Sequence, residues 1–348
     1  MISVKPEALH GARTAPEPRS RPDDGPPLLL VDDLRVTFTT ADGESLKAVD
    51  GISFDVRPGE TFGVIGESGS GKSTLGRAIV RLLDPTSGQI SYDGQDLARL
   101  KGRALRQRRR DLQIIFQDPN AALNPRMTIL DSVREPLDVV GKGDRASRIA
   151  RAMDRLDRVG ITPEQARRYP HELSGGQKQR VNIARALTLQ PRLMVCDEVV
   201  AALDVSIRGD VLNLFAEIQR EMGLSYVFIT HDIGVVSHIS DRVAVMYLGR
   251  FMELGPVEAI AERPMHPYTR ALMAAEPVPV PSWQRAPKRP PLQGEIPSPL
   301  NPPSGCRFRT RCPHARAACA ETVPDWRPIA RNHLVACHFA EEIAAAEQ

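Results

Sequence analysis

The first residues that could do chemistry form a glycine-rich loop between an apolar run and a helical pattern. The loop reads Gly66, Glu67, Ser68, Gly69, Ser70, Gly71, Lys72, Ser73 and Thr74. Its glycines allow successive backbone N–H groups to point at a phosphate chain, and the following helix adds its own unpaired N–H groups. Lys72 would place its ammonium on the β- and γ-phosphates, and the Ser73 hydroxyl would ligate Mg²⁺. The G-x-x-x-x-G-K-S spacing therefore predicts a site for a di- or triphosphate with Mg²⁺.

Two adjacent carboxylates at the end of a second apolar run could complete this site. Asp197 and Glu198 follow residues 193–196, whose pattern is typical of a buried parallel strand, and α/β sheets place ligand groups at the carboxyl ends of such strands. Asp197 suits the Mg²⁺ shell. Glu198 suits the base that orients or deprotonates a water, a role worth ~10²- to 10⁴-fold in rate. A surface carboxylate pair is the alternative, and the preceding apolar run disfavours it.

Two further polar side chains follow buried-strand patterns. Gln117 ends the run 112–116, and His231 ends the run 225–230. The Gln117 amide could reach Mg²⁺ and the attacking water, and His231 could donate to the γ-phosphate. Each residue by itself also suits a purely structural role.

A second helix start offers another place for an anion. Ser174, Gly175, Gly176 and Gln177 precede an amphipathic pattern over residues 178–189, yet the phosphate site already has its own loop. The chain therefore carries a spare half-site. Phe38, in an alternating apolar run, either stacks on a purine ring or is a half-buried strand residue.

Composition limits the environment of the chain more than its partners. The 348 residues carry a net charge of +3, spread over many charges of both signs, which favours neither nucleic acid nor an anionic membrane surface. With no apolar run long enough to cross a bilayer and no secretory leader, we expect a cytosolic protein. A basic stretch contains Arg103, Arg106, Arg108, Arg109 and Arg110. Without interleaved aromatics it favours a solvated helix face over a surface for nucleic acid or lipid headgroups.

The remaining patterns predict the elements that must hold these residues. Residues 1–27 should be a disordered leader, and residues 28–38 and 48–56 antiparallel strands. A helix should follow the phosphate loop, and residues 121–168 should form a helical insertion. Residues 276–303 should be an extended linker. The apolar face of the first helix is expected to contain Leu75, Ala78, Ile79, Leu82 and Leu83.

Taken together, these motifs resemble the nucleotide-binding subunit of ATP-binding-cassette (ABC) transporters over about residues 28–340. The resemblance implies an α/β P-loop NTPase of the ABC type, with a mixed core sheet, an antiparallel β subdomain and a helical subdomain at about 118–180. It divides the chain into a nucleotide-binding domain at 28–260 and a C-terminal extension at 261–348. The matching motifs are the Walker A loop (residues 66–73), the Q-loop at Gln117, the signature (173–177), the Walker B Asp197 with Glu198, and the switch His231.

This resemblance explains the spare half-site. In the family, two subunits pair head to tail, so that Ser174 and Gly176 of one chain close over ATP held by the Walker A loop of the other. Asp204 belongs to the D-loop beside this interface, and Phe38 takes the position of the aromatic that stacks on adenine. The D-loop departs from the usual pattern at Val199 and Ala201, which could weaken contact across the dimer without removing a catalytic group.

Further segments look like the oligopeptide/dipeptide/nickel importer ATPases, and most like their F-type subunit: residues 114–119, 124–127, 266–272 and 297–306. The implied function is ATP hydrolysis that drives uptake of peptides or a related small solute. The implied location is the cytoplasmic face of the cell membrane. The implied partners are a second ATPase subunit (a different chain or a second copy), two integral permease subunits and an extracytoplasmic solute-binding protein, with no nucleic acid. Two alternatives stay open: a soluble ABC ATPase acting on nucleic acid or ribosomes, and a plain phosphate-loop kinase or GTPase, which leaves residues 173–177 unexplained.

Four cysteines crowd into the last fifth of the chain: Cys306, Cys312, Cys319 and Cys337. Their C-x5-C-x6-C-x17-C spacing is wider than the knuckles typical of zinc sites, and the importer resemblance implies a [4Fe-4S] cluster. Zinc, with His314 or His338 as an additional ligand, is the second interpretation, and free thiols are the third. Cys196, inside a strand pattern, is expected to be a small core residue.

Overall fold

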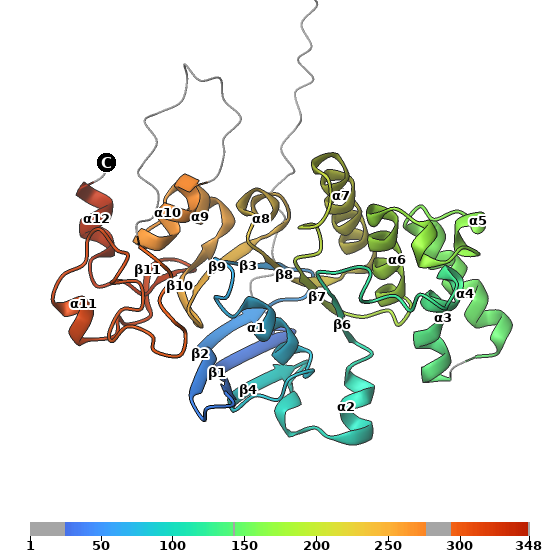
Figure 1. Ribbon diagram of the computed structural model, residues 1–348, viewed down its shortest axis with the longest axis horizontal. Coiled ribbons are helices and arrows are strands. Elements are labelled where there is room, and N and C mark those ends of the chain that lie inside the picture. The colour runs from blue at the N-terminus through green and yellow to red at the C-terminus, as the bar shows by residue number, and fades with distance from the viewer. Residues whose placement is uncertain (1–24, 142, 276–293, 347–348) are drawn as a thin grey trace, which may run out of the picture.

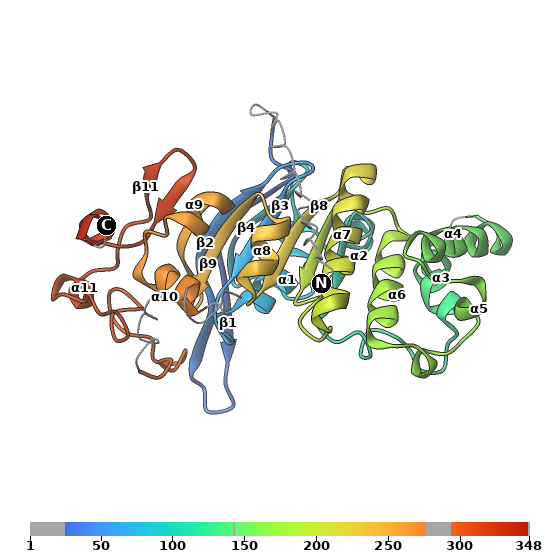
Figure 2. The same cartoon turned by 90° about the horizontal axis from the view of Figure 1, so that it is seen from above.

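The computed structural model describes residues 25–141, 143–275 and 294–346, which form two β-sheets flanked by helices (Figure 1). Most of the expected leader and linker, residues 1–24 and 276–293, lies outside this range. In both views the helical insertion and the cysteine-containing segment lie at opposite ends of the molecule (Figures 1 and 2). No helix among the described residues is both long enough and apolar enough to cross a membrane.

The smaller sheet is antiparallel, as the alternating apolar residues predict. Its strands are β1 (Leu29–Thr39), β2 (Ser45–Val56), β4 (Ser87–Tyr92) and β5 (Gln95–Asp96), in the order β2-β1-β4-β5. The buried face of β1 includes Leu29, Val31 and Leu34, each fully shielded from solvent. Because side chains alternate along a strand, this register leaves the intervening residues of β1 exposed.

The larger sheet has eight strands in the order β11-β12-β10-β9-β3-β8-β7-β6. Five neighbouring strands are parallel: β6 (Leu112–Ile115), β7 (Leu193–Asp197), β8 (Ser225–Thr230), β3 (Thr61–Ile65) and β9 (Arg242–Tyr247). The rest pair antiparallel: β10 (Arg250–Pro256), β12 (His333–Val335) and β11 (Arg327–Ala330). The expected mixed core sheet is confirmed. Cys196 is fully buried in β7, as expected of a core residue.

The helix after the phosphate loop is shorter than the sequence pattern predicts. α1 spans Lys72–Ile79 and buries Leu75, Ala78 and Ile79. Arg81 has a left-handed φ of 59°, which ends the helical path because a residue with a side chain cannot continue a right-handed helix there. The interpretation of Leu82 and Leu83 as part of the helix's apolar face was therefore wrong, because both residues follow the end of α1, and Leu82 is 48% exposed.

The helical insertion shares an apolar core with one side of the large sheet, because its buried residues belong to the same cluster as Cys196 of β7 and Phe228 of β8. Val133, Ala152 and Leu156 are among the residues buried in it. Its elements are α3 (Ile129–Val140), α4 (Arg145–Arg158), α5 (Pro163–Ala166), η2 (Pro170–Glu172) and α6 (Gly175–Leu187). The other helices are η1 (Leu97–Arg99), α2 (Gly102–Arg108), α7 (Val205–Met222), α8 (Ile233–Ile239), α9 (Val257–Glu262), α10 (Pro267–Ala275), α11 (Ala318–Glu321) and α12 (Ala340–Ala346).

Candidate functional site

The glycine-rich loop connects β3 to α1, in the strand-loop-helix order that the sequence predicts. Lys72 is only 4% exposed, and its Nζ donates to the carbonyl oxygens of Gly66 at 2.7 Å and Glu67 at 2.9 Å. Burial lowers the pKa of this ammonium, against the opposing effect of nearby carboxylates that include Glu198. The amine therefore lies inside the loop, where a phosphate chain would take the place of the two carbonyls.

Glycine is required at the end of this loop for steric reasons. Gly71 has φ of +105°, and a Cβ there would lie 2.1 Å from the Ala48 carbonyl oxygen in β2. The loop therefore lies directly against β2. Phe38 in β1 pairs with Leu46 of β2, close to Ala48, and its side chain is 38% exposed. Phe38 thus lies on the strand that pairs with the one touched by the loop, and it is partly accessible to solvent.

The predicted catalytic and Mg²⁺-binding side chains meet at the carboxyl ends of three neighbouring strands. Ser73 Oγ donates to Asp197 Oδ1 at 2.9 Å, so the loop and the end of β7 share a hydrogen bond. Burial raises the pKa of Asp197, while the Ser73 hydrogen bond and Arg77 act in the opposite direction. A divalent cation would reverse the effect of burial, because it favours the ionised carboxylate.

Glu198 contacts side chains that follow the other two strands, Gln117 after β6 and His231 after β8. Gln117 Nε2 donates to Glu198 Oε2 at 2.7 Å, and His231 Nδ1 lies 3.3 Å from Glu198 Oε1. Glu198 itself has a left-handed φ of 50°, a conformation that costs energy in a residue with a side chain and is common at active sites. The arrangement brings a carboxylate, an amide and an imidazole together beside the phosphate loop, as needed to orient a water.

The signature residues do not join this group within one chain. α6 begins at Gly175 and lies apart from α1 in both views (Figures 1 and 2). Ser174 caps this helix, because its Oγ accepts from Gln177 N at 3.3 Å while Gln177 Oε1 accepts from Ser174 N at 2.9 Å. Ser174 and Gly175 are exposed, whereas Gly176 packs where a Cβ would be 2.8 Å from Ile207. Asp204, exposed at the start of α7, is also available to a partner.

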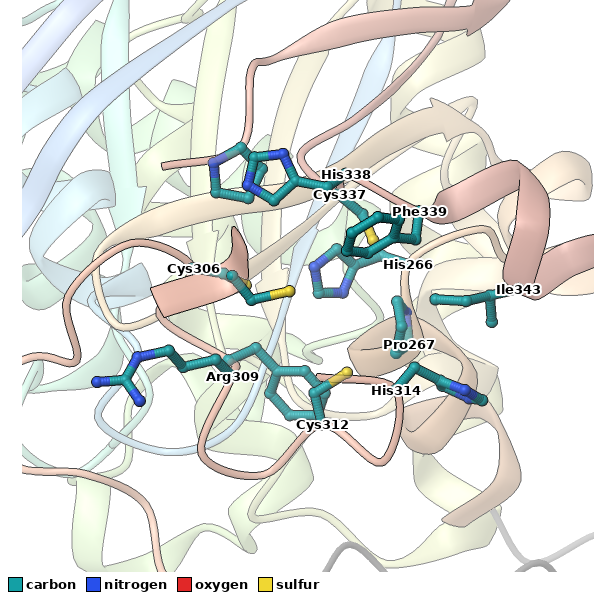
Figure 3. A pocket seen from close by; sticks show the side chains of 13 residues that line it. His266, Pro267, Cys306, Arg309, Cys312, His314, Cys337, His338, Phe339 and Ile343 are labelled. Carbon is teal, nitrogen blue, oxygen red and sulfur yellow. The ribbon is translucent and has the colours of Figure 1, made fainter. Parts of the chain in front are cut away.

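The four cysteines of the C-terminal segment line one small pocket, together with His266, His314 and His338. Figure 3 shows the sulfur atoms of Cys306, Cys312 and Cys337 directed toward this shared space. Burial raises the pKa of Cys312 to about 12 and that of Cys337 to about 11, and the nearby cysteines act in the same direction. Among the described residues, however, no group of three or more His, Cys, Asp or Glu side chains has an arrangement that could hold a metal ion.

Sequence reasoning missed the side chains that attach this segment to the phosphate loop. Arg311, next to Cys312, forms an ion pair with Glu67, and the Tyr268 hydroxyl accepts the Glu67 backbone N–H at 2.9 Å. Tyr268 stands in the 266–272 segment that resembles importer ATPases, which is the one sequence signal that pointed to it. No local pattern marks Arg311.

Comparisons with known proteins agree with this geometry. The family model described as "ABC transporter" matches residues 49–201, and the one described as "Oligopeptide/dipeptide transporter, C-terminal region" matches residues 252–319. A putative peptide import ATP-binding protein of Brucella ovis is 51% identical over 311 residues, covering 89% of this chain and 97% of that protein. The oligopeptide transport ATP-binding protein AppF of Bacillus subtilis is 50% identical over 295 residues, covering 84% of this chain and 90% of that protein.

Solved structures give the same answer for the fold. The dimeric post-hydrolysis state of the ATP-binding cassette MJ0796, bound to ADP and Pi, superposes with a TM-score of 0.61 at 30% identity and covers 66% of this chain and 98% of that one. The predicted ABC ATPase fold is thereby confirmed. Membership of this ATPase family also shows that the chain is an ATP-hydrolysing subunit. The chain belongs to the ABC transporter family, as an importer ATPase subunit that carries the oligopeptide/dipeptide transporter C-terminal region.

Proposed function

We propose that this subunit binds MgATP at the Walker A loop and hydrolyses it with Glu198 to drive the import of peptides. The observation that carries the proposal is the convergence of Lys72, Ser73–Asp197 and Glu198–Gln117 at adjoining strand ends. Peptide as the solute is supported by the names of relatives that match almost the whole chain. The site roles are Lys72 on the phosphates, Asp197 and Ser73 on Mg²⁺, and Glu198 as the base.

Two variants separate binding from chemistry. Lys72→Ala removes the point charge inside the loop, so affinity for ATP should fall by about tenfold or more. Glu198→Gln keeps the shape of the side chain and an oxygen that can accept the hydrogen bond from the Gln117 amide, but it removes the base. ATP should therefore still bind, while turnover falls by ~10²- to 10⁴-fold. Turnover by Glu198→Gln at the rate of the unmodified protein, with the partner subunit's own site silenced, would contradict the assignment.

The exposed start of the signature helix supports a head-to-tail pair of ATPase subunits. Ser174 is solvent-exposed at the start of α6, a helix that lies apart from α1 (Figure 1), while the related cassette structure is a dimer. A facing subunit would thus bring its own phosphate loop to Ser174 and Gly176. Either a second copy or a related chain fits this arrangement. The proposed division into domains at residues 28–260 and 261–348 is supported only in outline by two separate family matches, at 49–201 and 252–319.

A groove beside the helical insertion suits a segment of the membrane permease. It measures about 1000 Å³ and is lined by elements that include β6, α3 and α6. Val139, 82% exposed, and Leu82, 48% exposed, provide apolar contact at its wall. The groove is also lined by Arg103, Arg106, Arg109, Arg110 and Arg185. We infer that a permease segment with an apolar face and acidic side chains docks in this groove, with the subunit at the cytoplasmic face of the membrane.

Copurification tests this docking. Val139→Glu puts a carboxylate on the apolar part of the groove and should reduce recovery of the permease subunits, because it removes apolar contact and repels the acidic side chains inferred for the docked segment. Val323→Glu is the matched control, since Val323 is 52% exposed and belongs to the C-terminal segment. Equal recovery with both variants would mean that the permease does not use this groove.

A [4Fe-4S] cluster is the ligand that the four cysteines fit best. The donor set consists of soft thiols from one segment around one pocket, and a cubane is wider than a single ion, so it needs less tightly clustered sulfurs than zinc does. When bound, the cluster would supply four iron–thiolate bonds that hold the segment together. The cysteines would have to lose their protons, because thiolates are the ligands of iron.

Anaerobic purification distinguishes the cluster from zinc. The protein should be brown and contain about four irons per chain, and Cys312→Ser should lose most of them. Cys196→Ala is the control, because Cys196 lies in β7 outside the pocket and its loss should leave the iron in place. Stoichiometric zinc without iron would overturn the cluster proposal.

A further inference from the structure

One arginine of the four-cysteine segment binds a side chain of the Walker A loop directly. Arg311 Nη1 donates to Glu67 Oε2 at 2.6 Å, and Nη2 donates to Glu67 Oε1 at 3.0 Å. The Arg311 side chain is 6% exposed, so solvent screens this pair little. Bidentate arginine–carboxylate pairs fix orientation as well as distance. The contact therefore fixes the second residue of the loop relative to the cysteine segment.

A neighbouring arginine reaches the other end of the same loop through a turn. Arg307, next to Cys306, donates to the Leu248 carbonyl and to the Asp50 carboxylate. The following residue, Gly249, donates its N–H to the Ser70 carbonyl of the loop at 2.8 Å. Arg311 thus holds the loop directly at Glu67, and Arg307 holds it indirectly at Ser70 through the turn that contains Gly249.

An aromatic cluster joins these two attachments. Phe308 is fully buried, and its ring centroid lies 5.5 Å from that of Tyr247 and 5.2 Å from that of Tyr268. The Tyr268 hydroxyl accepts the Glu67 N–H at 2.9 Å. Because Phe308 lies between Arg307 and Arg311 in sequence, movement of the cysteine segment would disturb both arginines and Tyr268 together.

We propose that Arg311 and Tyr268 are positioning residues for ATP: they hold the backbone around Glu67 so that the loop is ready to receive phosphate. Affinity for ATP then depends on the correct folding of the four-cysteine segment. The inference rests on the proposed assignment of the Walker A loop as the ATP site. A purely stabilising role would instead leave ATP affinity unchanged wherever the protein remains folded.

The test measures the Kd and KM for ATP of full-length variants in parallel with their thermal stability. Arg311→Ala should raise both constants by about tenfold, while kcat at saturating ATP stays close to that of the unmodified protein. Arg311→Lys should recover part of the affinity, because a single ammonium retains the charge but not the bidentate geometry. Tyr268→Phe keeps the ring and loses the hydroxyl, so it should raise Kd by a smaller factor.

Arg327→Ala is the matched control, because Arg327 forms a bidentate ion pair with Glu341 inside the same segment. It should leave the Kd for ATP unchanged. Unchanged Kd in Arg311→Ala, or an equal loss in Arg327→Ala, would overturn the inference. Lys72→Ala separates failure of the proposed positioning role from failure of the assignment of the ATP site. If Lys72→Ala binds ATP normally, the loop is not the ATP site.

Discussion

Asp50 is a buried carboxylate that forms ion pairs with three arginines, and its replacement should destabilise the protein strongly. It is 3% exposed, and it pairs with Arg35 at 2.7 Å, with Arg250 at 2.9 Å and with Arg307. The side chain of Arg307 is 7% exposed, while that of Arg35 is 41% exposed. Asp50→Asn would therefore leave one deeply buried guanidinium without its counter-charge.

The magnitude follows from this difference in burial. Removing one partner of a buried ion pair costs about 3–5 kcal/mol, whereas an exposed pair is worth ~0–1 kcal/mol. We expect Asp50→Asn to lower the free energy of unfolding by an amount in the first range, and Arg35→Ala by one in the second. The double variant Asp50→Asn/Arg307→Leu should be more stable than Asp50→Asn alone, because it also removes the uncompensated buried charge.

The effect should also depend on pH. Burial by itself would raise the pKa of Asp50, but its hydrogen bond and ionic contacts with the arginines outweigh burial and lower the pKa from the ordinary value of an aspartate. On acidification the unfolded chain thus binds this proton before the folded protein does. The stabilisation is present above pH ~4 and is lost as the pH falls below that value.

Urea unfolding at neutral pH, with each variant compared with the unmodified protein, measures these free energies. The reasoning would be refuted by an Asp50→Asn protein within ~1 kcal/mol of the unmodified one. It would also fail if adding Arg307→Leu lowered the stability further.

Three other substitutions test the nucleotide site. Ser174→Ala should leave ATP binding by the single subunit intact and abolish ATP-driven dimer formation, which size-exclusion chromatography can follow; loss of ATP affinity in the monomer would contradict the trans role. Gly71→Ala should destabilise the loop by about 1–3 kcal/mol, because its Cβ would lie 2.1 Å from Ala48 O, and calorimetry should detect no ATP binding. Phe38→Ala should weaken ATP binding by about threefold to tenfold but leave binding of inorganic tripolyphosphate unchanged, and an equal loss for both ligands would argue against stacking.

The elements around the nucleotide site were predictable because each depends on local sequence. The phosphate loop requires glycines at fixed spacing, and Asp197 and Glu198 end an apolar strand that can lie only inside the sheet. Parallel strands bring their carboxyl ends to one edge, so Gln117 and His231 were expected near the same place. The hydrogen bond between Gln117 and Glu198 agrees with that expectation.

What the sequence did not reveal depends on long-range contacts and on single backbone angles. Arg311 and Glu67 are 244 residues apart, and no periodicity relates them. α1 ends where Arg81 adopts a left-handed conformation, although apolar residues continue at helical spacing. The exposed Leu82 then becomes part of the groove wall instead of the core.

The pairing of β12 with β10 has a consequence for how the chain is made. β10 is almost entirely buried, and its outer edge is covered at Glu253–Val335 and Leu254–Leu334. An uncovered apolar edge readily recruits strands from other chains. During synthesis β10 emerges long before β12, so this edge stays open while the cysteine segment is still being translated. The C-terminal hairpin of β11 and β12 therefore covers a strand edge that could otherwise pair with other chains. We expect a chain truncated before this hairpin to aggregate more readily than the full-length chain.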